Sequence, residues 1–289
     1  MKATGRAAAL LLVMAVCLAG CRPHEFSGQR AFKHVEALCA LGPRYVGSDA
    51  DRAAADYIAE TLTRYGWEVT RQDFAYGGER LQNVIATRGS GATVLLGTHY
   101  DTRPVAENDP LEPNSPVPGA NDGASGVGVL LEVARTLDPT ITADRRVMLA
   151  FFDGEDRGDI DGWEWAVGAR HLARPLANDA NARPEWVLIL DMVGDANQEL
   201  FWEWSSSVAL NEAVWQVAHD LGYRQQFVAR NKHHLIADHT PFIELGMPAA
   251  ILIDFDYPYW HTRQDTLDKI SVDSLQRVGD VITAFIKQE

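Results

Sequence analysis

Residues 93 to 101 read Thr93-Val-Leu-Leu-Gly-Thr-His-Tyr-Asp101, an apolar run that ends in an imidazole and a carboxylate. An apolar stretch of this length without polar alternation is typical of a strand buried on both faces, as in a parallel sheet. Comparable apolar runs occupy residues 146–152, 186–190 and 249–253. The sequence therefore predicts a sheet whose central strands are parallel and fully covered.

Segments with helical spacing alternate with these runs along the chain. Turn signals rich in glycine and proline separate them, and no repeat or low-complexity stretch interrupts the order. Alternation of this kind predicts one α/β domain, with a mostly parallel central sheet and helices on both faces. The expected helices are residues 31–41, 49–65, 123–137, 211–221 and 272–287, and the two remaining expected strands are residues 67–74 and 81–88.

Acidic and imidazole side chains follow the central strands, at the point where each strand ends. In α/β sheets the ligands bind just outside the carboxyl ends of the strands, which meet at one edge. One acid at a strand end is usually a surface group or a helix cap, but this many at one edge indicate a site. The residues concerned are His99 and Asp101, Glu155 and Asp156, Asp191, and Trp260 and His261, with Asp122 directly before a helix.

Zinc suits this set of side chains, because it binds carboxylate oxygens and imidazole nitrogens in tetrahedral geometry. Asp122, Asp156 and His261 supply three ligands and leave a fourth position open for water or substrate, as catalytic zinc sites do. Adjacent residues of an extended chain point in opposite directions, so one carboxylate of the pair Glu155 and Asp156 can bind the metal while the other stays free as an acid or base. Asp122 also suits a helix N-cap, and Glu155 with Asp156 also suits a hydrated acidic turn.

Six motifs occur in the order found in glutaminyl cyclases and related zinc aminopeptidases, and the resemblance covers residues 31–289. The last motif has a tryptophan directly before its histidine. In this feature the chain resembles the glutaminyl cyclase branch, the glutaminyl-peptide cyclotransferases. The resemblance implies a zinc exopeptidase-like fold and an enzyme that converts N-terminal glutamine to pyroglutamate with release of ammonia. The motifs are residues 97–101, 119–124, 151–156, 190–194, 238–242 and 259–262.

The resemblance also implies a role for each matching residue. Asp122, Asp156 and His261 become the ligands of one catalytic zinc ion. Glu155 becomes the acid/base that carries a proton from the α-amine to the departing ammonia, with Asp191 in the hydrogen-bond network around it. The residues implied to bind the substrate, which is the N-terminus of a peptide or protein, are Trp260, Trp163 or Trp165, and Asp238.

Three positions depart from the pattern of the cyclase family. Asp156 stands where many relatives have glutamate, so the backbone must approach the metal more closely. Ala237 stands where animal cyclases carry the first of two acids, and Ile251 stands where they carry a polar residue in the following strand. The last two changes remove polar members of the network around the catalytic acid, so we expect intact zinc binding and slower cyclisation.

Two other functions use the same residues or the same fold. A two-zinc aminopeptidase would add a second metal held by His99 and Asp191, with Asp122 bridging and Glu155 activating a water. A non-catalytic binding lipoprotein would keep the fold, although the presence of Glu155 argues against it. A serine hydrolase is disfavoured, because no Gly-x-Ser-x-Gly elbow follows a strand.

The first 21 residues read as a lipoprotein signal peptide. A basic start and a short apolar run precede Leu18-Ala-Gly-Cys21, which resembles a bacterial lipobox, in which the cysteine is lipidated. The apolar run is too short to cross a bilayer as a helix. We expect an exported protein anchored through Cys21 at the periplasmic face, with Arg22 favouring the outer membrane. A tether of residues 22–30 then leads to a catalytic domain of residues 31–289.

Charge and cysteine content limit the partners. The formal net charge of −14 argues against nucleic acid, whose phosphates require a basic surface. Cys39 has no partner for an intrachain disulfide once Cys17 leaves with the signal peptide and Cys21 is lipidated. We expect a monomer with one zinc ion, or with two zinc ions if the protein is an aminopeptidase.

Overall fold

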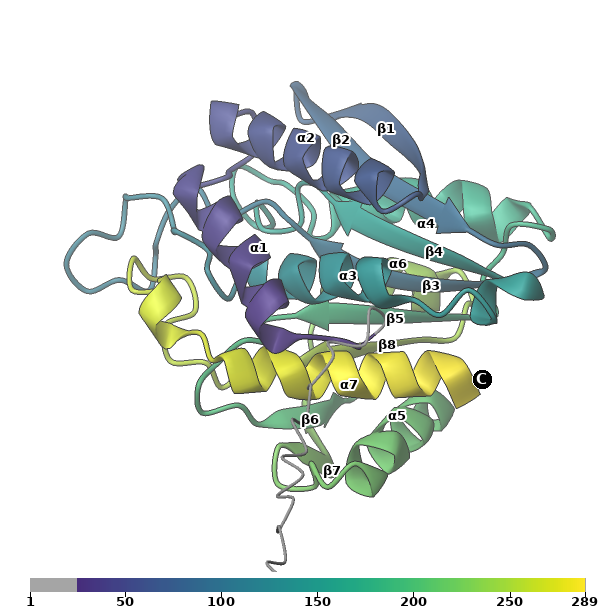
Figure 1. The fold of residues 1–289 in the computed structure, drawn as a ribbon. Helices are drawn as coiled ribbons and strands as arrows, with labels where there is room; N and C mark the ends of the chain where they lie inside the picture. The colour runs from purple at the N-terminus through teal and green to yellow at the C-terminus, as the bar shows by residue number, and fades with distance from the viewer. Residues whose placement is uncertain (1–24, 289) are drawn as a thin grey trace, which may run out of the picture.

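A computed structural model describes residues 25–288, and its central feature is a six-stranded sheet (Figure 1). The strand order is β1-β2-β4-β3-β5-β8. The strands β4, β3, β5 and β8 run parallel to one another, as the apolar runs predict. The strands are β1 (Glu68–Tyr76), β2 (Glu79–Arg88), β3 (Ala92–His99), β4 (Arg145–Phe152), β5 (Trp186–Asp191) and β8 (Ala249–Ile253).

The first two strands make one edge of the sheet antiparallel. β1 and β2 are joined by Gly77 and Gly78 alone, since Tyr76 pairs with Glu79. Both glycines have positive φ, 57° and 87°, which suits a two-residue hairpin turn and is costly for other residues. β2 also runs antiparallel to β4, so the sheet is mixed, with a parallel centre and an antiparallel edge.

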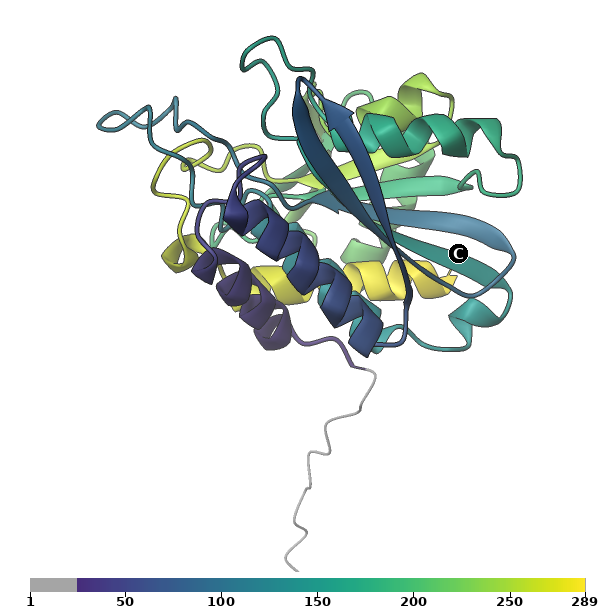
Figure 2. The ribbon, with the colours of Figure 1, turned by 90° about the horizontal axis from the view of Figure 1, so that it is seen from above.

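Helices cover both faces of the sheet (Figure 2). They are α1 (Gly28–Ala40), α2 (Asp49–Arg64), α3 (Ala124–Thr136), α4 (Val167–Asn178), α5 (Val208–Asp220), α6 (Thr240–Glu244) and α7 (Val272–Gln288). On one face α1, α3 and α7 pack together, with α2 beside β1 and β2, and on the other face α4 packs against α6. A smaller parallel sheet of β6 (Leu200–Glu203) and β7 (Phe227–His233) lies beyond β8, with α5 next to it.

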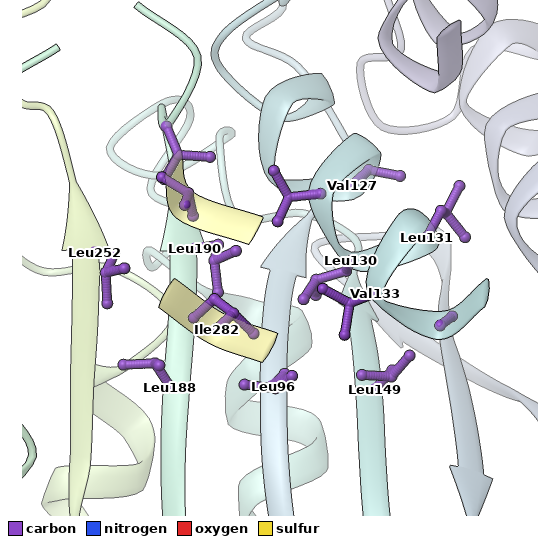
Figure 3. Close-up of a cluster of buried hydrophobic side chains, with 14 of the residues drawn as sticks. Leu96, Val127, Leu130, Leu131, Val133, Leu149, Leu188, Leu190, Leu252 and Ile282 are labelled. Carbon is purple, nitrogen blue, oxygen red and sulfur yellow. The ribbon is translucent and has the colours of Figure 1, made fainter. Parts of the chain in front are cut away.

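Side-chain alternation along the central strands builds two apolar layers. Leu96, Leu149 and Leu188 point from neighbouring strands toward α3 and α7 (Figure 3). Leu95 and Ile189, which adjoin them in the sequence, belong to the apolar layer on the face of α4 and α6. Burying one such side chain fully contributes roughly 1.5–3 kcal/mol, and burial on both faces explains why these strands carry apolar residues at consecutive positions.

The folded domain begins before residue 31. Phe26 is buried against Gly279 of α7, where an added Cβ would come within 2.1 Å of the phenyl ring. Ser27 caps α1, because its side-chain oxygen accepts a hydrogen bond from the N–H of Arg30. The expected tether of residues 22–30 therefore extends too far into the domain.

Two α-helices and two strands were not expected from the sequence, namely α4, α6, β6 and β7. α4 contains Pro175, and an internal proline removes a backbone donor and usually signals the end of a helix. α6 and β6 have only 5 and 4 residues, too few to show a hydrophobic period. β7 exposes most of its residues, so it lacks the apolar pattern of a core strand.

Candidate active site

The carboxyl ends of the parallel strands border a cavity of about 230 Å³. Asp191 ends β5, and Glu155 and Asp156 lie in the turn that follows β4. Asp122 lies shortly before α3, and the loop after β8 brings in His261. The cavity is lined by Asp122, Glu155, Asp156, Trp165, Asp191, Met192, His234, Leu235, Ile236, Ala237, Ile253, Phe255, Trp260 and His261.

Two groups of three buried side chains offer donor atoms to a metal ion, and within each group these atoms lie within 4.8 Å of one another. In the first group, Nε2 of His261 lies 3.0 Å from Oδ1 of Asp156 and 3.8 Å from Oδ2 of Asp122. In the second group, Nε2 of His99 lies 3.1 Å from Oδ1 of Asp122 and 3.3 Å from Oδ1 of Asp191. Asp122 belongs to both groups and turns one oxygen toward each histidine.

The donor set fits zinc. Oδ2 of Asp122 and Oδ2 of Asp156 are buried and have no hydrogen-bond partner within residues 25–288. Burial raises the pKa of Asp156 to about 7, and the charge of Asp122 adds to this rise, so the neighbouring side chains compensate the Asp156 carboxylate incompletely. A divalent cation would satisfy the free oxygens, and carboxylates with imidazole are a donor set that zinc prefers.

The backbone of Glu155 and Asp156 is fixed by a third acid, Asp101. The two oxygens of Asp101 accept hydrogen bonds from the N–H groups of Glu155 and Asp156, each at 3.1 Å. Burial raises the pKa of Glu155 well above its ordinary value, with the charge of His99 opposing the rise and the charge of Asp238 adding to it. A buried carboxyl with a raised pKa, next to metal donors, suits an acid/base.

Two further acids position the metal donors, and neither was predicted from the sequence. Oε1 of Glu107 lies 2.8 Å from Nδ1 of His261, so it orients the imidazole ring. Asp265 accepts hydrogen bonds from the N–H groups of Asn121 at 2.8 Å and Asp122 at 3.0 Å. Contacts of this kind fix the orientation of metal ligands and tune their affinity. The short spacing from His261 to Asp265 is a sequence signal for one of them, whereas Glu107 lies far from its partner in the chain.

Two of the three predicted tryptophans line the cavity. Trp260 stacks on His261, with ring centroids 3.8 Å apart and an interplanar angle of 28°. Trp165 lies parallel to the same imidazole at 6.3 Å and 9°. Trp163 is 5% exposed and packs in a small apolar cluster with Leu81. The position of Trp163 is that of a core residue, and it does not line the cavity.

The departures from the cyclase pattern lie at or near the cavity. Ala237 lines the cavity and Ile251 is fully buried in β8, so neither position offers a polar side chain. Asp238 is 1% exposed and is absent from the cavity lining, and its carboxylate oxygens have no hydrogen-bond partner in the described part of the chain. Burial raises its pKa well above the ordinary value. Asp238 is thus a buried acid behind the cavity wall rather than a group that faces a substrate.

Residues 83–286 match Peptidase family M28. The chain belongs to this family. The glutaminyl cyclase of Porphyromonas gingivalis is 32% identical, with a TM-score of 0.85 over 91% of this chain and 98% of that chain. A Zn-dependent exopeptidase from Parabacteroides distasonis is 31% identical, with a TM-score of 0.85 over 92% of this chain and 99% of that chain. Aminopeptidase YwaD of Bacillus subtilis is 28% identical in an alignment that covers 91% of this chain and 57% of that protein.

Family M28 membership confirms three expectations. The resemblance to glutaminyl cyclases and zinc aminopeptidases is confirmed, as is the single-domain zinc exopeptidase-like fold, and the protein is an enzyme of this family. The chain spans little more than half the length of the Bacillus aminopeptidase.

The lipoprotein form stays a prediction, because Cys21 lies outside the described residues. Within residues 25–288 no helix has the length and apolar character that a membrane span requires.

Proposed function

We propose that this M28 enzyme is a zinc-dependent glutaminyl-peptide cyclotransferase, which converts an N-terminal glutamine to pyroglutamate and releases ammonia. The observation that carries the proposal is the stacking of Trp260 on His261 in a cavity that also contains Glu155. This cavity, of about 230 Å³, has room for one side chain and its α-amine. Similarity to the Porphyromonas gingivalis glutaminyl cyclase over nearly the whole of both chains supports the proposal.

The reaction joins two groups of the same glutamine residue. The α-amine nitrogen attacks the carbon of the γ-amide, a ring C–N bond forms, and the bond from that carbon to the amide nitrogen breaks. Glu155 accepts the proton that the α-amine loses and delivers it to the departing nitrogen, which leaves as ammonia. The raised pKa of Glu155 suits both steps, because the carboxyl holds the proton between them. A zinc ion held by Asp122, Asp156 and His261 supplies a Lewis acid for the γ-carbonyl oxygen when it is bound.

The aromatic walls favour ring closure over hydrolysis. Trp260 and Trp165 lie on the imidazole side of the cavity, and Phe255 packs on Trp260 with ring centroids 4.9 Å apart. Walls of this kind hold a flexible glutamine side chain in a folded conformer and keep water away from its γ-carbon. Exclusion of water separates a cyclotransferase from a hydrolase that uses the same donors.

A two-metal aminopeptidase is the second candidate. The group of His99, Asp122 and Asp191 favours it, because its donors are as buried and as closely spaced as those of the first group. Similarity to aminopeptidase YwaD also favours it. In that reaction Glu155 would take a proton from a water molecule that attacks the first peptide bond. The two candidates therefore differ in the nucleophile and in the product.

One assay separates the candidates. The zinc-loaded protein is incubated with a glutaminyl peptide and a leucyl peptide of equal length, and zinc per chain is measured on the same sample. A cyclotransferase releases ammonia from the glutaminyl peptide and leaves a peptide with the same number of residues, whereas Glu155→Gln, prepared identically, is nearly inactive. Free leucine released faster than ammonia, with two zinc ions per chain, would assign the aminopeptidase instead. Release of neither product would favour the third hypothesis, a non-catalytic binding protein.

We also propose that the protein is exported and acts as a monomer anchored through Cys21, at the periplasmic face of the outer membrane. The lipobox-like sequence that ends at Cys21 supports the anchor, and Arg22 in place of an acid supports the outer membrane. Labelled fatty acid should enter the wild-type protein and should not enter Cys21→Ser. Fractionation of the host membranes then tests the location, and light scattering of the protein without residues 1–21 tests the monomer.

A further inference from the structure

One wall of the active-site cavity is a segment without regular structure. Residues 234–237 are the first part of the connection from β7 to α6, and all of them line the cavity. Ile236 is 55% exposed, so this wall segment extends to the mouth of the cavity. The buried acids Asp122 and Asp156 mark the inner end, where the α-amine and γ-amide of a substrate react. The wall segment therefore faces the part of a substrate that follows its first residue.

A buried carboxylate links this wall segment to the neighbouring strand β6. Glu203 is the last residue of β6 and is 1% exposed. Its Oε1 accepts a hydrogen bond from the N–H of Leu235 at 3.1 Å, and its Oε2 lies 3.0 Å from Nε2 of His239. The N–H and hydroxyl groups of Ser205 and Ser206 donate to the same Oε2 at 2.8 to 3.1 Å. Glu203 therefore holds the wall segment at Leu235 and just beyond its end.

The serine turn is itself anchored in the main sheet. The N–H of Ile251 in β8 donates to Oγ of Ser206 at 3.3 Å. The N–H of Ser207 donates to the carbonyl oxygen of Ala249 at 2.7 Å. β8 leads into the loop that carries Trp260 and His261, so Glu203 ties the wall segment to the strand that precedes this loop.

The charge of Glu203 matters for this attachment. Burial opposes the charge, but the hydrogen bond and charge of His239, with the donors of Ser205, lower the pKa of Glu203 to about 2. Hydrogen bonds to an ionised acceptor contribute about 1.5–3 kcal/mol, roughly twice as much as neutral ones. Removing the charge should therefore loosen the wall segment without removing any side chain from the cavity lining.

We propose that Glu203 is a positioning residue for the substrate, and that it holds the wall against which the residue after the N-terminal glutamine packs. This inference rests on the proposed cyclotransferase function and adds a specificity determinant to it. Leu235, Ile236 and Ala237 face the same cavity as Phe255, so the wall beyond His234 is apolar. A peptide with an apolar second residue gains the most from a wall that is held in place.

The test compares steady-state kinetics of the wild type and Glu203→Gln on two peptides, one beginning Gln-Phe and one beginning Gln-Gly. We expect KM for the Gln-Phe peptide to rise about tenfold, which corresponds to a binding loss of about 1.4 kcal/mol. The KM for the Gln-Gly peptide should rise by less than about threefold, with kcat and zinc content unchanged, because no reacting group moves. Glu212→Gln, which changes an exposed acid on α5, is the matched control.

A second variant keeps the test valid if Glu203→Gln folds poorly. Ser205→Ala removes one hydroxyl donor from the same carboxylate and should shift the ratio of the two KM values in the same direction by a smaller factor. An unchanged ratio in both variants, or a loss of zinc in parallel with kcat, would overturn the positioning role.

Failure of the cyclotransferase proposal has a different signature. The wild-type protein then releases no ammonia from either peptide, whatever residue stands at position 203. The same KM ratio is then measured for leucine release from Leu-Phe and Leu-Gly peptides. An unchanged ratio in that assay overturns the role of Glu203, and a raised ratio for the Phe peptide supports it.

Discussion

Two cavities of about 230 Å³ each border the end of β4, and both contain buried aspartates. In the active-site cavity Asp122 and Asp156 face the imidazole of His261. In the second cavity Asp51 and Asp153 are 3% and 1% exposed, and each has one carboxylate oxygen with no hydrogen-bond partner among residues 25–288. The residues that line the second cavity include no histidine. The cavities therefore contain the same side chain with different neighbours.

The neighbours decide what a buried aspartate becomes. Burial opposes the ionisation of Asp122, but the hydrogen bond and charge of His99 hold its pKa below the ordinary value. Burial raises the pKa of Asp51 to about 8, and the charge of Asp101 adds to this rise. Burial also raises the pKa of Asp153 well above its ordinary value. His99 therefore keeps Asp122 ionised and available to a cation. His261 opposes the rise at Asp156, whose pKa still reaches about 7, whereas no imidazole opposes the rise at Asp51 or Asp153.

The largest expected effect comes from removing a metal donor from the active-site cavity. Asp122→Ala, Asp156→Ala or His261→Ala removes one of three protein donors, so zinc retention and activity should be lost together. Elemental analysis after dialysis and an ammonia-release assay measure both. Asp51→Asn in the second cavity is the comparison, and it should retain its zinc. Full zinc retention by all three alanine variants would contradict the ligand assignment.

The next effect separates the chemistry from metal binding within the active-site cavity. Glu155→Gln keeps the shape of the side chain and removes its ability to take a proton, so activity should fall by ~10² or more while zinc stays bound. Single-turnover ammonia release with zinc analysis checks this. Glu164→Gln, which changes an exposed acid on the same connecting segment, is the control. A fall in zinc content that matches the fall in activity would make Glu155 a ligand instead.

A smaller effect concerns the acid that orients the metal-binding imidazole. Glu107→Gln weakens the contact to Nδ1 of His261, and losses of this kind typically reduce metal affinity by about 10-fold to 100-fold. Competition with a zinc chelator measures the affinity. Glu112 lies in the same loop and pairs with Arg263 at the surface. The variant Glu112→Gln should therefore keep the wild-type zinc affinity. Equal affinities of the two variants would show that Glu107 does not orient the ligand.

The parts of the fold and site that the sequence predicts depend on local patterns. Consecutive apolar residues such as Leu95 and Leu96 face opposite apolar layers, so they mark a strand covered on both sides. The parallel direction of these strands brings Glu155, Asp191 and His261 to one edge, although they are far apart in the chain. The strand ends therefore indicate the active-site cavity, and the helix that follows Asp122 indicates the remaining metal donor.

The parts that the sequence does not predict depend on contacts between distant segments. Glu107 reaches His261, and Glu203 reaches Leu235, across loops whose paths no local pattern specifies. Trp163 is predicted to contact substrate because it shares a motif with Trp165, but its side chain packs in an apolar cluster and does not line the cavity. The packing of the whole domain decides which polar or aromatic side chains are buried, and local sequence patterns do not specify that packing.

The smallest expected effect on function comes from the second cavity, where a substitution changes stability and leaves the zinc bound. Folded Asp51 keeps its proton up to about pH 8, whereas an aspartate with the ordinary pKa of 3.8 loses it at much lower pH in the unfolded chain. The folded state therefore binds more protons than the unfolded state between these values. It follows that the stability associated with this proton is fully present below about pH 4 and is lost as the pH rises to about 8.

Asp51→Asn should remove this pH dependence. The asparagine keeps an acceptor for the N–H of Gly47, which lies 3.2 Å from Oδ2 of Asp51, and replaces the ionisable oxygen by a neutral amide. We expect the free energy of unfolding to rise more at pH 8 than at pH 5, by on the order of 1–4 kcal/mol, since each unit of pKa shift corresponds to about 1.4 kcal/mol. Urea unfolding of the zinc-loaded protein at both pH values measures the difference. Asp49→Asn, an exposed acid in the first turn of the same helix, should leave the difference unchanged. A gain from Asp51→Asn that is equal at pH 5 and pH 8 would show that packing, and not the proton, separates the two cavities.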